Sequence, residues 1–238
     1  MTDQTPVLRL ENIVKTFPGV RALDGVALSV MPGEVHALMG ENGAGKSTLM
    51  KVLGGIHQPN EGQIFIGEEP TVMTSPIQAK ARGVVFIHQE LSLADELTVA
   101  ENIFLGELPC KSFGRVDWPK LRADTDAILK TLNVRFNART IVGSLSIANQ
   151  QMVEIARALT VEPKAVIFDE PTASLTDAEK VVLFDVISDL KSRGVGIVYI
   201  SHRMEEIFRM TDRISVLRDG QYRGTLITSE TNEDEVTN

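Results

Sequence analysis

The stretch Gly40-Glu-Asn-Gly-Ala-Gly-Lys46-Ser47 limits the fold of this chain more than any other. It matches the pattern G-x-x-x-x-G-K-[S/T], follows an apolar run at 35–39 and opens a helical pattern that continues through Leu53. Glycines let backbone N–H groups turn toward phosphate oxygens, and the following helix adds the positive end of its dipole. The sequence therefore predicts an α/β protein that binds a nucleoside triphosphate at the end of a strand.

Each residue type in this loop has a predicted part in holding the phosphates of a nucleotide and Mg²⁺. Lys46 is expected to reach the β- and γ-phosphates, and the Ser47 hydroxyl to ligate Mg²⁺. Thr48 is expected to add a phosphate contact. The other contacts are assigned to the remaining loop residues, Gly40, Glu41, Asn42, Gly43, Ala44 and Gly45.

Two adjacent carboxylates follow a second buried-strand pattern. The run Ala165–Phe168 leads directly into Asp169 and Glu170. In a parallel sheet the carboxyl ends of the strands meet at one edge, so these acids are expected beside the phosphate loop. Asp169 is predicted to hold Mg²⁺, directly or through water, and Glu170 to act as general base on the attacking water.

Strand and helix patterns alternate over much of the chain. Buried-strand runs at 84–87, 165–168 and 196–200 are separated by helical patterns, which is typical of a mostly parallel sheet. Shorter strand-like runs occupy 7–10, 27–30 and 64–66. Asp219-Gly220, between apolar runs, predicts a β-hairpin. From 91 to 159 the pattern is mostly helical, with Asp117 as a helix cap and Trp118 packed at that helix start.

Composition excludes several classes of protein. No apolar run approaches the roughly 18 residues that a membrane helix needs, and the first residues do not resemble a signal peptide. The single cysteine, Cys110, permits no intrachain disulfide, which suits a reducing compartment. A net charge of −8 argues against nucleic acid as the main partner. The acidic segment 229–238 is expected to be a solvated tail or the start of a linker.

These motifs together resemble the nucleotide-binding domain of ABC transporters over nearly the whole chain. Gln89, the segment LSIANQQ at 145–151 and His202 stand in that family's order and spacing. The resemblance implies that Gln89 approaches Mg²⁺, that His202 contacts the γ-phosphate, and that Phe17 stacks on adenine. It places Lys46, Gln89, Glu170 and His202 in catalysis, and Ser47, Gln89 and Asp169 at the metal.

The resemblance also implies a domain plan. A P-loop NTPase core with an N-terminal antiparallel β subdomain is expected at 1–90 and 160–228, with an inserted helical subdomain at 91–159. Segments such as FPGVRALDGV and DEPTASLT are similar to the importers of ribose, galactose, xylose and related sugars. In that group the ATPase is a tandem of two such domains, which implies that this chain is the first half.

ABC domains act as head-to-tail pairs, so the resemblance implies a second ATPase domain as partner, fused or as a second copy. One domain's phosphate loop then faces the other's signature, here Ser146, Ile147, Ala148, Asn149 and Gln150. Ile147 and Ala148 stand where the family has glycines, although their N–H groups at a helix start are retained. Two unequal ATP sites are therefore expected. Thr176, where the family usually has Asp, opens a predicted capping box with Glu179.

The remaining implied partners are a transmembrane permease and, indirectly, an extracellular or periplasmic sugar-binding protein. The permease is expected to dock on the helical subdomain near 89–102, which places the chain at the cytoplasmic face of the cell membrane. Two alternatives stay open. One is a soluble ABC-class ATPase that acts on ribosomes. The other is a nucleotide-regulated binding module with little hydrolysis.

Overall fold

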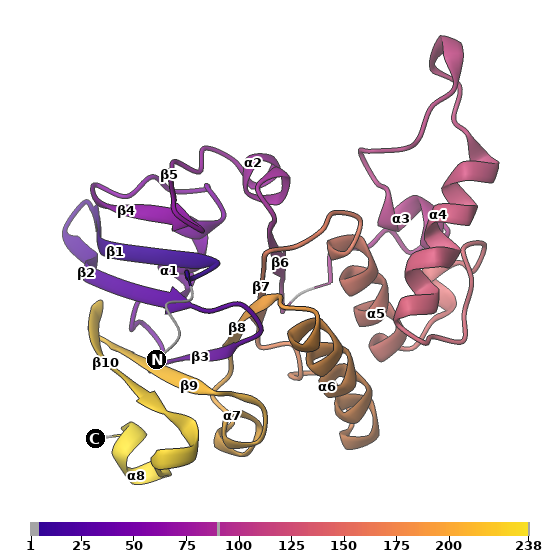
Figure 1. Cartoon of the computed structure of the whole chain (residues 1–238). Helices are drawn as coiled ribbons and strands as arrows, with labels where there is room; N and C mark the ends of the chain where they lie inside the picture. The colour runs from indigo at the N-terminus through magenta and orange to yellow at the C-terminus, as the bar shows by residue number, and fades with distance from the viewer. Residues whose placement is uncertain (1–4, 90, 238) are drawn as a thin grey trace. The chain divides into compact units, whose positions relative to one another are not determined.

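The chain divides into two compact units in its computed structural model, which describes residues 5–89 and 91–237. Each unit has its own buried core and is treated separately here. Figure 1 shows the elements of both by label. Unit 1 is assembled from Met1–Phe86, Pro163–Glu170 and Ile187–Asn238, and unit 2 from Ile87–Glu162 and Pro171–Val186.

A four-stranded antiparallel sheet in unit 1 has the order β2-β1-β4-β5. Its strands are β1 (Leu8–Phe17), β2 (Val20–Val30), β4 (Glu61–Ile66) and β5 (Glu69–Thr71). The first two are longer than the sequence predicts. Asn12 has a φ of 49°, and the β1–β2 register shifts between Leu10 and Ile13, so the alternation of buried residues breaks inside the strand.

The second sheet has six strands in the order β10-β9-β3-β8-β7-β6. They are β3 (Val35–Met39), β6 (Val84–Ile87), β7 (Ala165–Asp169), β8 (Gly196–Ile200), β9 (Arg213–Arg218) and β10 (Gln221–Ile227). Strands β9, β3, β8 and β7 pair in parallel, and β10 pairs antiparallel with β9. Asp219 and Gly220 both have positive φ between β9 and β10, which confirms the predicted hairpin turn.

The helices of unit 1 are short. They are α1 (Lys46–Leu53), α2 (Pro76–Ala81), α7 (Met204–Met210) and α8 (Glu233–Thr237). Helix α2 begins where Ser75 accepts a hydrogen bond from the Gln78 N–H, with Pro76 in the first turn, where its missing N–H costs nothing. A longer helix, α6 (Asp177–Ser192), has residues in both units and ends just before Gly194, whose φ is 84°.

The acidic segment after β10 is partly helical, and its acidic side chains are exposed. Its role as a tail or as the start of a linker stays a prediction. A 3₁₀ turn at Thr228–Glu230 leads into α8, as Figure 1 shows. Val236 is only 5% exposed, in a buried cluster with Ile207 and Ile214. One apolar side chain thus holds an otherwise acidic segment against the core. Residue 238 lies outside the described residues.

Unit 2 contains α3 (Val99–Ile103), α4 (Trp118–Thr131) and α5 (Ile147–Ala158), with 3₁₀ turns at Ser112–Gly114 and Val142–Ser144. The Asp117 side chain accepts from the Lys120 N–H, which confirms it as the cap of α4. Within the described parts of the chain, no helix is both long enough and apolar enough to cross a membrane.

Candidate functional site: the phosphate loop and its carboxylates

The phosphate loop joins β3 to α1 and requires glycine at its last position. Gly45 has a φ of 104°, in the left-handed region. A Cβ atom there would lie 2.8 Å from the Ala22 carbonyl oxygen and 2.9 Å from Leu23 Cδ2. No larger residue fits this position without moving the backbone of β2. The first turn of α1 therefore starts directly at Lys46, with N–H groups that have no partner within the helix.

The outer side of the loop is held by the β9–β10 turn. The Gly220 N–H donates to the Ala44 carbonyl at 3.1 Å, and the Gly220 carbonyl accepts from the Asp24 N–H at 2.7 Å. A Cβ atom added at Gly40 would also meet the Leu217 carbonyl of β9. The β9–β10 turn thus bonds the loop directly, and β2 in turn bonds that turn through Asp24.

The Lys46 side chain folds back over the loop. Its Nζ donates to the Gly40 carbonyl at 2.5 Å and to the Glu41 carbonyl at 3.0 Å. Partial burial lowers the pKa of Lys46, and the negative charges of Glu170 and Asp169 partly oppose that shift. The ammonium group is therefore within electrostatic reach of both carboxylates, as the sequence predicts.

The two acids occupy the end of β7. Asp169 is the last residue of the strand and pairs with Ile200 of β8, and the Glu170 N–H donates to the Ile200 carbonyl at 2.9 Å. Glu170 has a φ of 47°, which is unusual for a residue with a side chain. Such backbone strain concentrates at functional sites.

His202 reaches the same carboxylate from the neighbouring strand. It lies two residues beyond the end of β8, and its Nδ1 is 3.2 Å from Glu170 Oε1. Its side chain is 67% exposed, against 24% for that of Glu170. The structure thus brings Lys46, Asp169, Glu170 and His202 together, as the spacing of their motifs predicts.

Phe17 ends β1 and is half-buried. Its ring meets the edge of His57 at a centroid distance of 5.2 Å, and Lys15 Nζ lies 5.2 Å from its centroid. Part of the Phe17 side chain therefore remains exposed to solvent. The predicted stacking on adenine stays a prediction.

The other predicted site residues belong to unit 2. Gln89 is exposed, just beyond β6, and its approach to a metal stays a prediction. In the signature segment, Ser146 caps α5 by accepting from the Asn149 N–H at 3.4 Å. The Ile147 side chain is 46% exposed, and Gln150 donates to the Val142 carbonyl. The cap predicted at Ser146 is therefore confirmed, while its part in binding a second domain's nucleotide is not tested.

Thr176 and Glu179 form one half of the predicted capping box, the part in which the Glu179 carboxylate reaches back to Thr176. The Glu179 carboxylate accepts from the Thr176 N–H at 2.9 Å and from its hydroxyl at 2.7 Å. The backbone hydrogen bond first, and then the hydroxyl, lower the pKa of Glu179. This local role accounts for threonine at the position without any partner domain.

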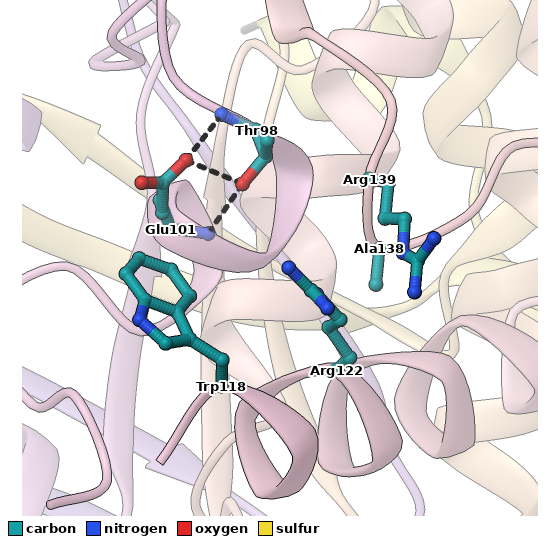
Figure 2. A pocket seen from close by; sticks show the side chains of 6 residues that line it. All are labelled: Thr98, Glu101, Trp118, Arg122, Ala138 and Arg139. Carbon is teal, nitrogen blue, oxygen red and sulfur yellow. Dashed lines mark hydrogen bonds between the residues drawn. The ribbon is translucent and has the colours of Figure 1, made fainter. Parts of the chain in front are cut away.

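A cavity of about 400 Å³ in unit 2 was not predicted from the sequence. Figure 2 shows the Trp118 indole and the Arg122 guanidinium pointing from α4 toward the turn that carries Thr98 and Glu101. Ala138 and Arg139 complete the lining. Trp118 does start α4 as expected, but it is 42% exposed rather than packed away. The spacing of Trp118 and Arg122, four residues apart on a helix, was the available signal.

The carboxylate that lines this cavity has hydrogen-bond donors, whereas the two guanidinium groups lack ion-pair partners among the described residues. The Glu101 carboxylate accepts from the Thr98 N–H and hydroxyl in a capping box, and these bonds, with a smaller contribution from Arg122, lower its pKa. Within the described part of the chain, neither Arg122 nor Arg139 forms an ion pair. The cavity therefore offers guanidinium groups beside an aromatic ring.

The family model named ABC transporter matches residues 23–173, which include the phosphate loop, Gln89, the signature segment and both carboxylates. The chain belongs to the ABC transporter family. Its fold is that of a P-loop ATP-binding cassette, as the sequence predicts.

Two curated relatives are similar over almost the whole chain. One, from Hahella chejuensis, is named a putative ribose/galactose/methyl galactoside import ATP-binding protein and is 47% identical over 97% of this chain. The other, from Rubrobacter xylanophilus, is named ribose import ATP-binding protein RbsA 2 and is 50% identical over 98% of it. The chain spans 45% of the length of each relative.

Solved cassettes share the fold. The ADP conformation of MJ1267, an ATP-binding cassette of an ABC transporter, is 30% identical with a TM-score of 0.83 and covers 98% of this chain and 94% of its own. The dimeric structure of MJ0796, a bacterial ABC transporter cassette, is 27% identical with a TM-score of 0.76. It covers 93% of this chain and 98% of its own.

Proposed function

We propose that this cassette is the N-terminal ATPase half of an importer for a simple sugar. The observation that carries the proposal is the convergence of Lys46, Asp169, Glu170 and His202 at one phosphate loop. A regulatory binding module needs the loop but not a carboxylate–imidazole pair at 3.2 Å beside it. Relatives named as ribose or galactose import proteins support the choice of cargo.

The residues of unit 1 fit Mg²⁺ as well as ATP. Ser47 in the first turn of α1 and Asp169 at the end of β7 offer a hydroxyl and a carboxylate, the hard oxygen donors that Mg²⁺ prefers. Mg²⁺ commonly uses one or two such groups and takes its other ligands from water and phosphate. When bound, the ion neutralises charge on the β- and γ-phosphates.

The chain's own groups then divide the work of hydrolysis. Lys46 exchanges its loop carbonyls for phosphate oxygens, and the free N–H groups of α1 bind the remaining phosphate charge. Glu170 accepts a proton from the attacking water, and His202 holds that carboxylate in place while it contacts the γ-phosphate. The strained backbone at Glu170 aims the base before ATP arrives.

A second ATPase domain completes the site in this proposal. The dimeric cassette structure of MJ0796 supports such pairing, as do relatives more than twice this chain's length. Ser146 and the N–H groups at the start of α5 then face the partner's nucleotide, and the partner's signature faces Lys46. The assembly lies peripherally at the cytoplasmic face of the cell membrane, on a permease that a sugar-binding protein loads.

The first test is transport by the full-length ATPase reconstituted with its permease and sugar-binding protein. We expect Mg²⁺-dependent ATP turnover that rises with the loaded binding protein, and ribose or galactose uptake that requires ATP. ATP binding without any turnover would instead favour the regulatory module. Turnover that depends on ribosomes, with co-sedimentation, would favour the translation-associated ATPase.

A second prediction concerns the cavity of Figure 2. Thr98 and Glu101 belong to the segment expected to meet the permease, and Arg122 faces them without an ion pair in the described structure. Arg122→Glu is expected to reduce uptake at least about tenfold while ATP binding is retained. The new carboxylate would share the cavity with that of Glu101, and like charges placed together at a contact cost several kcal/mol.

The matched control is Lys120→Glu, which makes the same charge change on α4 but outside the cavity. Vesicle uptake should stay within about twofold of wild type for this variant, as expected for exposed charges. Equal uptake by both variants would remove the cavity from the permease contact.

A further inference from the structure

Few contacts of the His202 side chain itself fix the orientation of its imidazole ring. Its side chain is 67% exposed, and in the described residues its imidazole has one hydrogen-bond partner, Glu170. It stands in a short turn between β8 and α7, and α7 has no side-chain cap from Arg203. The orientation of the ring therefore depends on how that turn is held.

The Ser201 hydroxyl precedes His202 in the turn between β8 and α7 and forms hydrogen bonds with residues that follow it. Ser201 is only 4% exposed, and its Oγ accepts from the Arg203 N–H at 3.1 Å. The same oxygen donates to Glu206 Oε2 at 3.3 Å. A single hydroxyl thus connects the residues on both sides of His202 and ties them to α7.

Glu206 fixes the other end of this connection. It lies in the first turn of α7, is 6% exposed, and its Oε2 also accepts from the Tyr199 hydroxyl at 2.9 Å. Tyr199 is fully buried in β8. A buried carboxylate is costly unless hydrogen-bonded, and the two hydroxyl donors on this one oxygen link β8 to α7.

We propose that Ser201 and Glu206 are positioning residues that hold His202 toward Glu170. This inference rests on the proposed ATPase function, since the geometry that it explains is that of the base and the γ-phosphate contact. The Ser201 and Glu206 side chains are buried, whereas the His202 side chain beside them is 67% exposed.

Ser201→Ala tests the proposal in the full-length ATPase with its permease. The variant keeps the Tyr199–Glu206 bond, so the buried carboxylate is not stripped of donors. We expect kcat to fall about three- to tenfold, the equivalent of one net hydrogen bond, with an unchanged KM for ATP. In the double variant with His202→Ala the loss should equal that of His202→Ala alone, because Ser201 acts through His202.

Thr211→Val is the matched control. Thr211 is another buried hydroxyl of the same region, at the opposite end of α7, where it bonds the Ile207 carbonyl and Thr228. Its loss should lower the melting temperature about as much as Ser201→Ala but leave kcat within about twofold. Glu206→Gln, which keeps an oxygen for one hydroxyl, should fall between wild type and Glu206→Ala in kcat.

A readout without turnover separates this inference from the proposed function. The chain has four histidines, so the imidazole signals of the 238-residue chain can be assigned by NMR. Ser201→Ala should shift the His202 signal and leave that of buried His36 unchanged, and Thr211→Val should shift neither. An unmoved His202 signal, or additive losses in the double variant, would overturn the inference even if the wild-type ATPase is active. Absent wild-type turnover with a shifted His202 signal would instead count against the proposed function alone.

Discussion

Replacing Lys46 with alanine in the full-length ATPase is expected to lower ATP turnover by at least about 100-fold. Lys46 is the one loop side chain whose positive charge reaches both carboxylates, and its Nζ is held over the loop by the Gly40 and Glu41 carbonyls. Alanine removes the charge that neutralises the β- and γ-phosphates. Steady-state turnover and nucleotide binding, measured on the same preparation, check the result.

Ser146→Ala is the comparison that tests whether the two ATP sites are unequal. Ser146 caps its own helix, and Ile147 and Ala148 replace the family's glycines beside it, so this signature is expected to serve the weaker site. We expect its loss to reduce turnover only a few-fold, in line with one hydrogen bond to phosphate. Comparable losses in Lys46→Ala and Ser146→Ala would refute the asymmetry. Melting temperatures of both variants control for folding.

Glu170→Gln is expected to reduce kcat by at least about 100-fold, because the amide cannot accept the proton of the attacking water. Glutamine keeps the size of the side chain and an oxygen that can face His202 Nδ1. ATP binding should therefore be retained, and the ATP-bound pair of domains should accumulate. Single-turnover hydrolysis and equilibrium ATP binding distinguish loss of chemistry from loss of affinity.

Asp177→Asn provides the control for a change of carboxylate to amide near the same strand-to-helix segment. Asp177 is exposed in the first turn of α6 and pairs with Lys180 on the surface, so its loss should change kcat by less than about twofold. If Glu170→Gln matched this control, Glu170 would not be the general base, and the proposed hydrolysis would need another proton acceptor.

The sequence predicted the parts of the site that depend on local rules. Strand bounds at 35–39, 84–87 and 196–200 match the structure, because strands that are buried on both faces carry mostly apolar runs. The phosphate loop needs glycine at Gly45 for a backbone reason that holds in any context. The turn at Asp219-Gly220 follows the same logic.

The features that the sequence did not predict depend on contacts between residues that are far apart in the sequence or lie on different elements. Helix α8 is five residues long and acidic at its start, so it has no periodic signal, and among the side chains of α8 that the structure describes only Val236 is buried. Glu206 reads as one of two adjacent surface acids in MEEIF, and only the packing of α7 on β8 reveals it as buried. The cavity beside Trp118 likewise requires α3 and α4 to be placed in three dimensions.

The contacts of Gly220 with Ala44 and Asp24 have a consequence for how tightly and how fast nucleotide binds. A loop that is already bonded to the β9–β10 turn, which β2 holds in turn, loses less conformational entropy when phosphate binds. Association then needs no slow ordering of the loop, so differences in ATP affinity are expected mainly in the dissociation rate. Lengthening the hairpin between β9 and β10 is expected to loosen this support and weaken ATP binding, although the hairpin lies outside the phosphate loop in the sequence.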